Sequence, residues 1–237
     1  NHHQNVLFIR VRKMIRITFP AYVLIKQYLS KDQNSEITPE YMVALKNEID
    51  AMRRRDPTGR NVSNRNGWQS VDGVDTNPVF IRAMRQIKRE FRDELIPFLG
   101  IEKNTAHIDL HNSWANINYP GAWNAPHLHN GCFYSGVFFI HADGDEGDFR
   151  AIDTDHKIVS NFPASQQRIW ESMPIAPKTG DLYLFPSGLM HMVEPNLTDK
   201  DRYSISFNFD VSGGVARENI KNPNLDFEID ENGDMIY

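Results

Sequence analysis

Residues 118–140 read NYPGAWNAPHLHNGCFYSGVFFI, a turn-rich segment that contains a His-x-His pair and runs into an apolar strand. His127 and His129 are separated by one residue in a segment that we expect to be extended. Side chains alternate between the two faces of a strand, so both imidazoles should point to one face, where they can bind one metal ion. His191 lies in a second extended segment, and Arg202 follows it. Together these residues predict a metal site with a cation nearby.

Three histidines suit a metal of the iron or zinc type, because such metals accept imidazole nitrogen readily. Three protein ligands on one side of the metal leave the other coordination positions free for substrate and dioxygen. Any single histidine would more often be a polar residue at the rim of a barrel or a hydrogen-bonded residue of its core. The three histidines in combination, on strands that the expected fold brings together, favour the metal site.

The chain after Gly100 has a hydrophobic period of two residues, which indicates strands, and turns rich in Gly, Pro, Asn and Asp separate them. About nine short strands with helices in front predict a mainly β fold with flanking helices, a jelly roll buttressed by two N-terminal helices. The expected strands are 105–119, 123–129, 132–141, 149–153, 157–162, 167–173, 181–185, 190–195 and 203–211.

The two expected helices precede this region. The first begins at Thr38-Pro39 and ends near Arg55, and the second runs from Asn77-Pro78 to Gly100 with a strong apolar stripe. Residues 14–30 predict one or two short strands, or a strand that leads into a helix. Residues 56–75 are polar and rich in Gly and Asn, so we expect a surface loop or lid.

A length of 237 residues with 40% hydrophobic content fits one domain. We expect residues 14–100 to form a helical and strand support region of that domain, 101–212 the catalytic core and 213–237 a C-terminal arm. The polar tail after Ser212, with its acidic stretch at 226–234, is expected to wrap the surface or serve as a second lid. Residues 1–13 support no structural argument.

The composition excludes several classes of protein. A net charge of -5 does not indicate nucleic-acid binding, which usually requires a basic surface. A single cysteine excludes an internal disulfide framework and agrees with a reducing compartment. No apolar run approaches the ~18 residues that a membrane span needs, and the N-terminal residues do not resemble a signal peptide. We therefore expect a cytoplasmic protein, in the host cytoplasm if the source is viral. The oligomeric state cannot be read from the sequence.

Several short motifs follow one another along residues 114–209. They are Asn118-Tyr119, Pro126-His127-x-His129, Ser135 to Phe139, Gly180 to Pro186 ahead of His191, and Arg202-x-Ser204. In this order they resemble the double-stranded β-helix of iron(II)- and 2-oxoglutarate-dependent oxygenases, on the prolyl hydroxylase-like side of that superfamily. Within it, the closest resemblance is to the oxygenases of this kind from marine bacteria and cyanophages.

This resemblance implies a catalytic site and two small-molecule cosubstrates. It implies that Fe(II) is bound by His127, His129 and His191, and that Arg202 and Ser204 hold the far carboxylate of 2-oxoglutarate. Dioxygen is the second cosubstrate, and the reaction is hydroxylation of a C–H bond. A prolyl or other peptide residue is the substrate that the family suggests, although a small molecule is also compatible. The further residues expected to line the cosubstrate pocket are Asn116 and Tyr119.

Position 129 departs from the family pattern, which has a carboxylate there. A neutral imidazole leaves the Fe(II) site one unit more positive, and three neutral ligands are still chemically workable. The nearest carboxylates in sequence, Asp143, Asp145 and Glu146, are expected to lie in a solvated hairpin turn. Two alternatives stay open: a cupin-like metalloenzyme with three histidines that does not use 2-oxoglutarate, and a non-catalytic jelly roll that serves in binding or structure.

Overall fold

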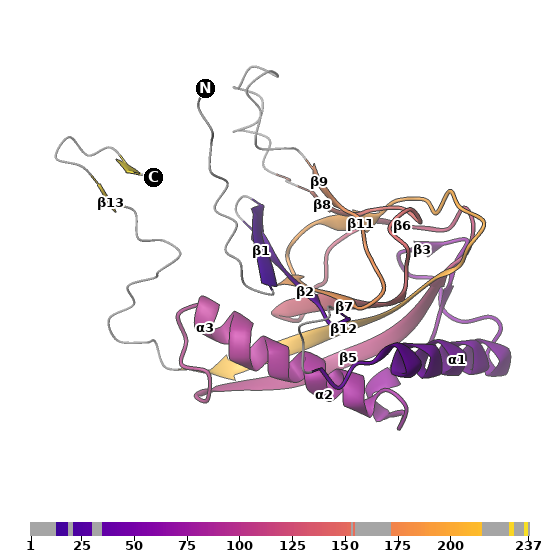
Figure 1. Ribbon diagram of the computed structural model, residues 1–237, viewed down its shortest axis with the longest axis horizontal. Helices are drawn as coiled ribbons and strands as arrows, with labels where there is room; N and C mark the ends of the chain where they lie inside the picture. Colours follow the sequence, from indigo (N-terminus) through magenta and orange to yellow (C-terminus); the bar gives the residue numbers. More distant parts are fainter. Residues whose placement is uncertain are drawn as a thin grey trace, which may run out of the picture.

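Two antiparallel sheets form the body of the protein (Figure 1). The computed structural model describes residues 13–18, 21–29, 35–152, 154, 172–214, 228–229 and 235–236. The large sheet has the order β1 (Lys13–Thr18), β2 (Ala21–Gln27), β10 (Asp181–Pro186), β7 (Tyr134–His141), β12 (Arg202–Gly213), β5 (Ala106–Asn118) and β4 (Trp68–Gln69). The small sheet has the order β3 (Asn64–Arg65), β6 (Trp123–His127), β11 (His191–Val193), β8 (Phe149–Ile152) and β9 (Ser172–Ile175). The predicted jelly roll is confirmed.

Helix α1 (Pro39–Arg55) begins and ends where the sequence predicts. The hydroxyl of Thr38 accepts a hydrogen bond from the backbone N–H of Tyr41, and Pro39 occupies the first turn. A capping hydroxyl satisfies one of the N–H groups that lack a partner at a helix start, and proline fits there because its missing N–H would be unpaired anyway. The buried face is made of Tyr41, Met42, Leu45 and Ile49.

The second predicted helix is present as three consecutive segments. They are α2 (Ile81–Glu90), the π-helical turn η2 (Phe91–Leu95) and α3 (Ile96–Phe98). The apolar stripe is buried along the whole run, with Phe80, Ile87, Phe91 and Leu95 at no more than 1% exposure. The sequence pattern therefore located the helix correctly but did not reveal the wider turn inside it.

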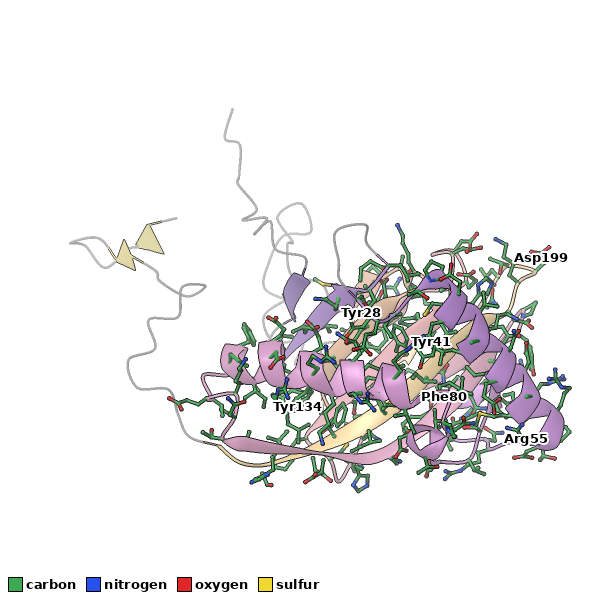
Figure 2. The ribbon with its side chains drawn as sticks, turned by 60° about the horizontal axis from the view of Figure 1, so that its bottom comes forward. Tyr28, Tyr41, Arg55, Phe80, Tyr134 and Asp199 are labelled. Carbon is green, nitrogen blue, oxygen red and sulfur yellow. The ribbon has the colours of Figure 1, made fainter. Side chains whose placement is uncertain are left out.

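Both helices lie across one face of the large sheet (Figure 2). Leu45 and Ile49 of α1 belong to the same buried cluster as Leu182, Ile205 and Phe207 of the large sheet. Apolar surface removed from water stabilises the fold by about 25 cal/mol per Å², so this contact fixes the outer face of the sheet. The predicted buttressing by two helices has its physical basis in this cluster.

A second, smaller core fills the space on the other face of the large sheet. It joins Val137 and Phe139 of β7, Phe185 of β10 and Phe149 of β8. Val137, Phe139 and Phe185 alternate along β7 and β10 with residues of the outer cluster, as a sheet covered on both faces requires. The inner face therefore meets the small sheet, and the candidate site lies between the two.

The segment 56–75 is mostly a surface loop, as one of the two predicted alternatives has it, and it also contains two short strands. β3 pairs with β6, and β4 pairs with β5, so this segment adds an edge strand to each sheet. Trp68 and Ser70 are buried, and the Trp68 indole N–H donates to the carbonyl of Asp56. The polar side chains of the segment form hydrogen bonds with backbone groups. Short sequence patterns do not predict such contacts.

The other expected elements have mixed outcomes. Residues 14–30 form two strands, β1 and β2, paired as a hairpin. The predicted strand 157–162, most of 167–173 and most of the acidic stretch 226–234 lie outside the described residues. Across the part of the chain that the structure describes, no helix combines the length and apolarity that crossing a bilayer requires.

Gly136 is a position where the fold requires the absence of a side chain. A Cβ placed there would lie 2.4 Å from a ring carbon of the fully buried Phe207 and 2.8 Å from Leu184. We predict that Gly136→Ala lowers the free energy of unfolding by about 1–3 kcal/mol, because the core must shift to admit the methyl group. Chemical denaturation measures this change. Gly188→Ala is the matched control, since a Cβ there meets nothing within 4 Å; equal effects of the two substitutions would contradict the prediction.

Candidate metal centre

The three predicted histidines come together from two segments of the small-sheet side. His127 is the last residue of β6, and His191 is the first residue of β11. The two are direct partners in the antiparallel pairing of these strands. His129 lies beyond the end of β6, so the expectation of a strand through residue 129 is wrong. Its position is fixed instead by its backbone N–H, which donates to the carbonyl of Ser187 at 2.9 Å.

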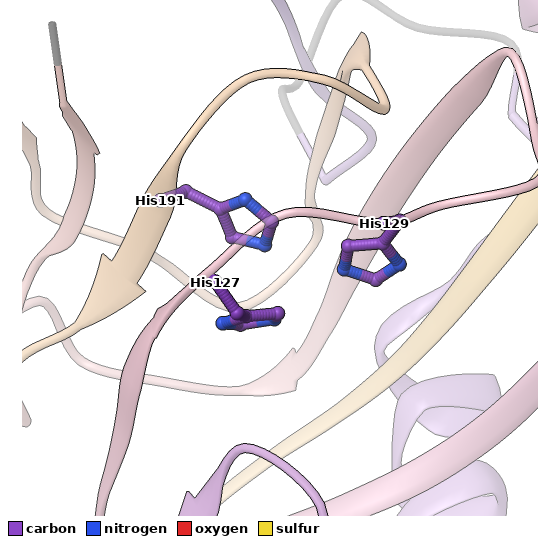
Figure 3. A group of neighbouring side chains, drawn as sticks. All are labelled: His127, His129 and His191. Carbon is purple, nitrogen blue, oxygen red and sulfur yellow. The ribbon is translucent and has the colours of Figure 1, made fainter. Parts of the chain in front are cut away.

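The imidazole nitrogens converge on one point (Figure 3). One ring nitrogen from each histidine lies within 4.8 Å of those of the other two. The ring centroids are 4.2 Å apart for His127 and His191, 5.1 Å for His127 and His129, and 5.2 Å for His129 and His191. Two nitrogens that bind one metal at about 2.0–2.1 Å each lie at most about 4.2 Å apart. The three rings are therefore near the spacing for a single ion and would move slightly together to bind it.

Two of the rings are oriented by backbone carbonyls. Nδ1 of His127 lies 2.7 Å from the carbonyl oxygen of Ala125, and Nδ1 of His191 lies 2.8 Å from that of Leu189. A carbonyl only accepts, so each Nδ1 carries the proton and each Nε2 keeps a free lone pair. A fixed tautomer of this kind is typical of histidines that bind a metal.

The environment keeps all three rings neutral. Burial lowers the pKa of His127, lowers that of His129 to about 4 and holds that of His191 well below its usual value. The neighbouring imidazoles also lower the pKa of His129 and His191, because a second positive charge nearby is unfavourable. Neutral imidazole is the form that binds a metal ion.

Aromatic side chains enclose the three rings. Phe149 stacks on the His191 ring at 5.4 Å, and Phe185 lies 4.7 Å from it. Trp114 stacks on His129 at 5.8 Å. These contacts limit the rotation of the imidazoles and exclude water from one side of the centre. Trp114 is thus part of the wall of the site.

A pocket beside the histidines contains most of the other predicted site residues. Arg202, Ser204 and Asn116 line it, together with the three histidines. Arg202 and Ser204 point the same way because they are two residues apart on β12. The sequence prediction therefore identified one connected cavity from segments that are far apart in the chain.

Arg202 is the charged group of this pocket. It is only 2% exposed, and its Nη1 donates to the carbonyls of Glu146 and Gly147, both at 2.8 Å. None of the carboxylates in the described residues lies within ion-pair distance of its guanidinium. Burial lowers the pKa of Arg202 to about 10, so the side chain is still a cation at neutral pH. A buried cation without a counter-ion is unfavourable, and the pocket is therefore suited to an anion.

Two predictions near the pocket are wrong. Tyr119 does not line it, because this residue faces the helix layer, where the guanidinium of Arg53 lies 5.7 Å from its ring centroid. Its neighbour Asn118 takes the inward position instead and pairs with Arg202 across the strands. Glu146 is not solvated but fully buried, because its carboxylate accepts backbone N–H groups of its own turn.

Several pocket residues were not predicted. Ser206 lines the pocket, and Asn208 hydrogen-bonds with His129. Both continue the every-second-residue pattern that starts at Arg202 and Ser204, so the period of a strand would have found them. Asn124 belongs to the pocket through a chain in which Asn118 donates to Asn124, which donates to Ser63. That chain has no signature in the sequence.

The donor set fits a divalent transition metal. Three neutral imidazoles form the group, and no carboxylate joins it among the residues that the structure describes. Imidazole suits iron, zinc, copper and nickel better than the hard cations calcium and magnesium, which prefer oxygen. The adjoining cationic pocket adds a place for an anionic ligand next to the metal.

Residues 112–208, a little under half of the chain, match the model of a protein family described as "Putative 2OG-Fe(II) oxygenase". This match confirms the resemblance that the motifs predicted. A search of curated proteins found no match. The expected closeness to enzymes of marine bacteria and cyanophages stays a prediction.

Solved structures share the fold over most of both chains. A prolyl-4-hydroxylase of Pseudomonas putida is 19% identical and covers 75% of this chain and 90% of its own, with a TM-score of 0.50. HygX of Streptomyces hygroscopicus, solved with nickel and 2-oxoglutarate bound, is 14% identical over 79% of this chain and 82% of its own, with a TM-score of 0.52. The non-heme alpha ketoglutarate dependent carbocyclase SnoK is 10% identical over 80% and 82%, with a TM-score of 0.51. At these low identities, the similarity to the three structures shows only that this chain shares their fold.

Removal of a ligand should abolish metal binding. We predict that His127→Ala or His191→Ala weakens the binding of Fe(II) or Ni²⁺ by more than about 100-fold, since even outer partners of metal ligands are worth 10–100-fold. His129→Asp should retain the metal, because a carboxylate is also a ligand for these ions. Metal analysis after anaerobic purification measures both effects. His111→Ala, at an exposed histidine paired with Asp210, is the control that should keep full metal content; loss of metal from His129→Asp would remove His129 from the ligand set.

Proposed function

We propose that the chain is a dioxygenase in which His127, His129 and His191 bind Fe(II), since residues 112–208 match the model of the 2OG-Fe(II) oxygenase family. The observation that carries this proposal is one pocket with three neutral imidazoles at one end and, beside them, a buried guanidinium that forms no ion pair with the described residues. 2-Oxoglutarate has a metal-chelating end and a second carboxylate, and so it matches both features.

Arg202 is proposed to hold the second carboxylate. Both hydrogens of its Nη1 go to the carbonyls of Glu146 and Gly147. The donors on Nη2 and Nε remain, and they form the parallel pair that grips a carboxylate at two oxygens. The hydroxyl of Ser204 has no hydrogen-bond partner among the described residues and lines the same pocket, so it can add a third donor.

Asn116 supports the same assignment. Its Nδ2 donates to the hydroxyl of Ser206 at 3.0 Å, while its buried Oδ1 accepts no hydrogen bond from the residues that the structure describes. Oxygen and nitrogen of an amide are nearly equal in shape, and their assignment follows the hydrogen-bond network. With the amide reversed, Ser206 donates to Oδ1 and the NH₂ group faces the pocket. In that orientation Asn116 offers N–H donors to an anionic cosubstrate, and no buried acceptor is left unsatisfied.

The bound iron and 2-oxoglutarate would supply the activation of dioxygen, coupled to decarboxylation of the 2-oxo acid to succinate and carbon dioxide. The protein residues would hold the metal, orient the imidazoles that bind it and keep water away from the site. The imidazoles stay neutral because they are buried, and the carbonyls of Ala125 and Leu189 keep their Nε2 atoms toward the metal. Phe149 and Phe185 keep water away from the His191 side, which protects a reactive oxidant from side reactions.

The substrate is proposed only as a molecule that presents a C–H bond to the metal centre. A prolyl or other peptide residue is the first candidate to test, because prolyl hydroxylation is the activity named for one of the structural neighbours. Fold alone does not define the substrate, so this part of the proposal depends on assay. The buried Arg202 disfavours a three-histidine enzyme without 2-oxoglutarate, since such an enzyme needs no anion-binding group there.

Arg202→Ala should separate cosubstrate binding from metal binding. Truncating one partner of a buried charge pair costs 2–5 kcal/mol, so the Kd for 2-oxoglutarate should rise by at least about 30-fold while the metal content stays unchanged. Calorimetric titration of Ni²⁺-loaded native protein and Ni²⁺-loaded Arg202→Ala protein with 2-oxoglutarate measures the change in Kd. Arg60→Ala, which removes an exposed arginine paired with Asp72, is the control. Native affinity in Arg202→Ala would contradict the proposed role.

Turnover should depend on 2-oxoglutarate and on iron. We predict that the iron-loaded protein releases succinate, and that a peptide panel containing proline raises this rate above the rate without substrate. The rate should vanish in His191→Ala and persist in His111→Ala. Release of succinate without stimulation by any peptide would favour a small-molecule substrate, whereas no release from iron-loaded protein that binds 2-oxoglutarate would contradict the activity itself.

A further inference from the structure

The turn between β7 and β8 contains a carboxylate with no exposed surface. Glu146 is 0% exposed, although it lies in a turn with the exposed residues Asp143 and Asp145. Its two side-chain oxygens accept the backbone N–H of Asp143 at 2.9 and 3.0 Å, and one of them also accepts the N–H of Gly144 at 3.1 Å. Glutamate is almost never fully buried without partners, and here the partners are the N–H groups of the turn itself. The carboxylate therefore holds the turn in one shape from the inside.

The same turn provides the acceptors for the buried cation of the pocket. The carbonyls of Glu146 and Gly147 accept the two hydrogens of Arg202 Nη1. Each of these bonds fixes one direction of a planar guanidinium, so together they set the plane and the tilt of the whole group. The direction in which Nη2 and Nε point is thus determined by the backbone of residues 146 and 147.

Glu146 also contributes charge. Burial is the main influence on the pKa of Arg202 and lowers it to about 10, and Glu146 is the largest of the charges that act in the opposite direction. None of the described carboxylates is close enough to form an ion pair with the guanidinium. The charge of Glu146 thus stabilises the Arg202 cation without a direct contact, and the Nη2 and Nε donors that face the pocket stay available. A direct carboxylate partner would instead compete with an anionic ligand for those donors.

The far side of the turn is fixed as well. Gly147 has a φ of 92°, and a Cβ added there would lie 2.5 Å from the carbonyl oxygen of Glu194. The backbone of the turn is therefore packed between Glu194 on one side and the buried Glu146 side chain on the other. The contact with Glu194 holds the turn on one side only, so its shape on the other side depends on the hydrogen bonds that Glu146 accepts.

We propose that Glu146 is a positioning residue that sets the orientation of the Arg202 guanidinium for 2-oxoglutarate. It acts through the turn whose carbonyls bind Nη1, and it does not itself contact the cosubstrate. This inference rests on the proposed function, because it requires Arg202 to bind the far carboxylate. It goes beyond that function by assigning a role in cosubstrate affinity to a residue outside the pocket.

The test is a double-mutant cycle on the Ni²⁺-loaded protein, titrated with 2-oxoglutarate. Glu146→Ala should raise the Kd for 2-oxoglutarate by about tenfold, as expected for a misplaced binding group, and leave the metal content unchanged. In the Arg202→Ala background, Glu146→Ala should have no further effect on that Kd, because the group that it positions is gone. With the iron-loaded protein, the KM for 2-oxoglutarate should rise while kcat at saturation stays close to native.

Control variants separate positioning from general loss of structure. Asp145→Asn removes an exposed carboxylate of the same turn and should leave the Kd for 2-oxoglutarate unchanged. Glu146→Gln keeps one acceptor oxygen of the same reach, so its Kd should lie between those of the native protein and Glu146→Ala, even if the alanine variant folds poorly. Equal Kd values for native, Glu146→Gln and Glu146→Ala proteins, or additive effects in the double mutant, would overturn the inference. If the native protein itself does not bind 2-oxoglutarate, the proposed function fails rather than the role of Glu146.

Discussion

The antiparallel pairing of β11 with β6 is the constraint on which the metal centre depends. It places His191 directly opposite His127, and the other edge of β11 pairs with β8, where His191 faces Ala151. A slip of one residue would turn His191 to the other face of the sheet, because side chains alternate along a strand. Strands on both sides hold β11 against such a slip. The geometry of the site is therefore a property of the small sheet as a whole, and His129 completes it through the contact of its backbone with Ser187.

The chemistry of the pocket follows from how burial acts on different charged groups. Burial lowers the pKa of the imidazoles and favours their neutral form, which is the form that can bind a metal ion. A guanidinium keeps its proton under the same conditions, since even a lowered pKa of about 10 leaves Arg202 a cation at neutral pH. One water-poor cavity thus presents neutral donors for a metal and a fixed cation for an anion. The turn at residues 143–147 supports this arrangement, because its backbone carbonyls bind the cation. Its buried carboxylate shapes the turn without contacting the guanidinium.

The residues before Gly100 make the jelly roll rigid where it carries the site. α1 and α2 cover the outer face of the large sheet, while β3 and β4 extend the edges of both sheets. Ser63, next to β3, reaches the pocket itself through Asn124. The long strands β5 and β12, which supply the polar floor of the pocket, are thus held from the helix side and from one edge. The N-terminal segments therefore contribute to the site as well as to stability.

The sequence by itself determined the class of fold and pointed to residues that the structure brings together in one candidate site. The period-two pattern after Gly100, the pair His127 and His129, and the later His191 and Arg202 follow local rules of strands and metal ligands, which act over a few residues. Only the tertiary structure decided the rest. It turned Tyr119 toward α1, buried Glu146 inside its own turn, and placed two edge strands in a polar segment that the sequence predicts as a surface loop or lid. The physical reason is that burial and the outward or inward direction of a residue at a strand end depend on which distant segments pack against it. Those partners are remote in sequence, so no local pattern of the chain records them.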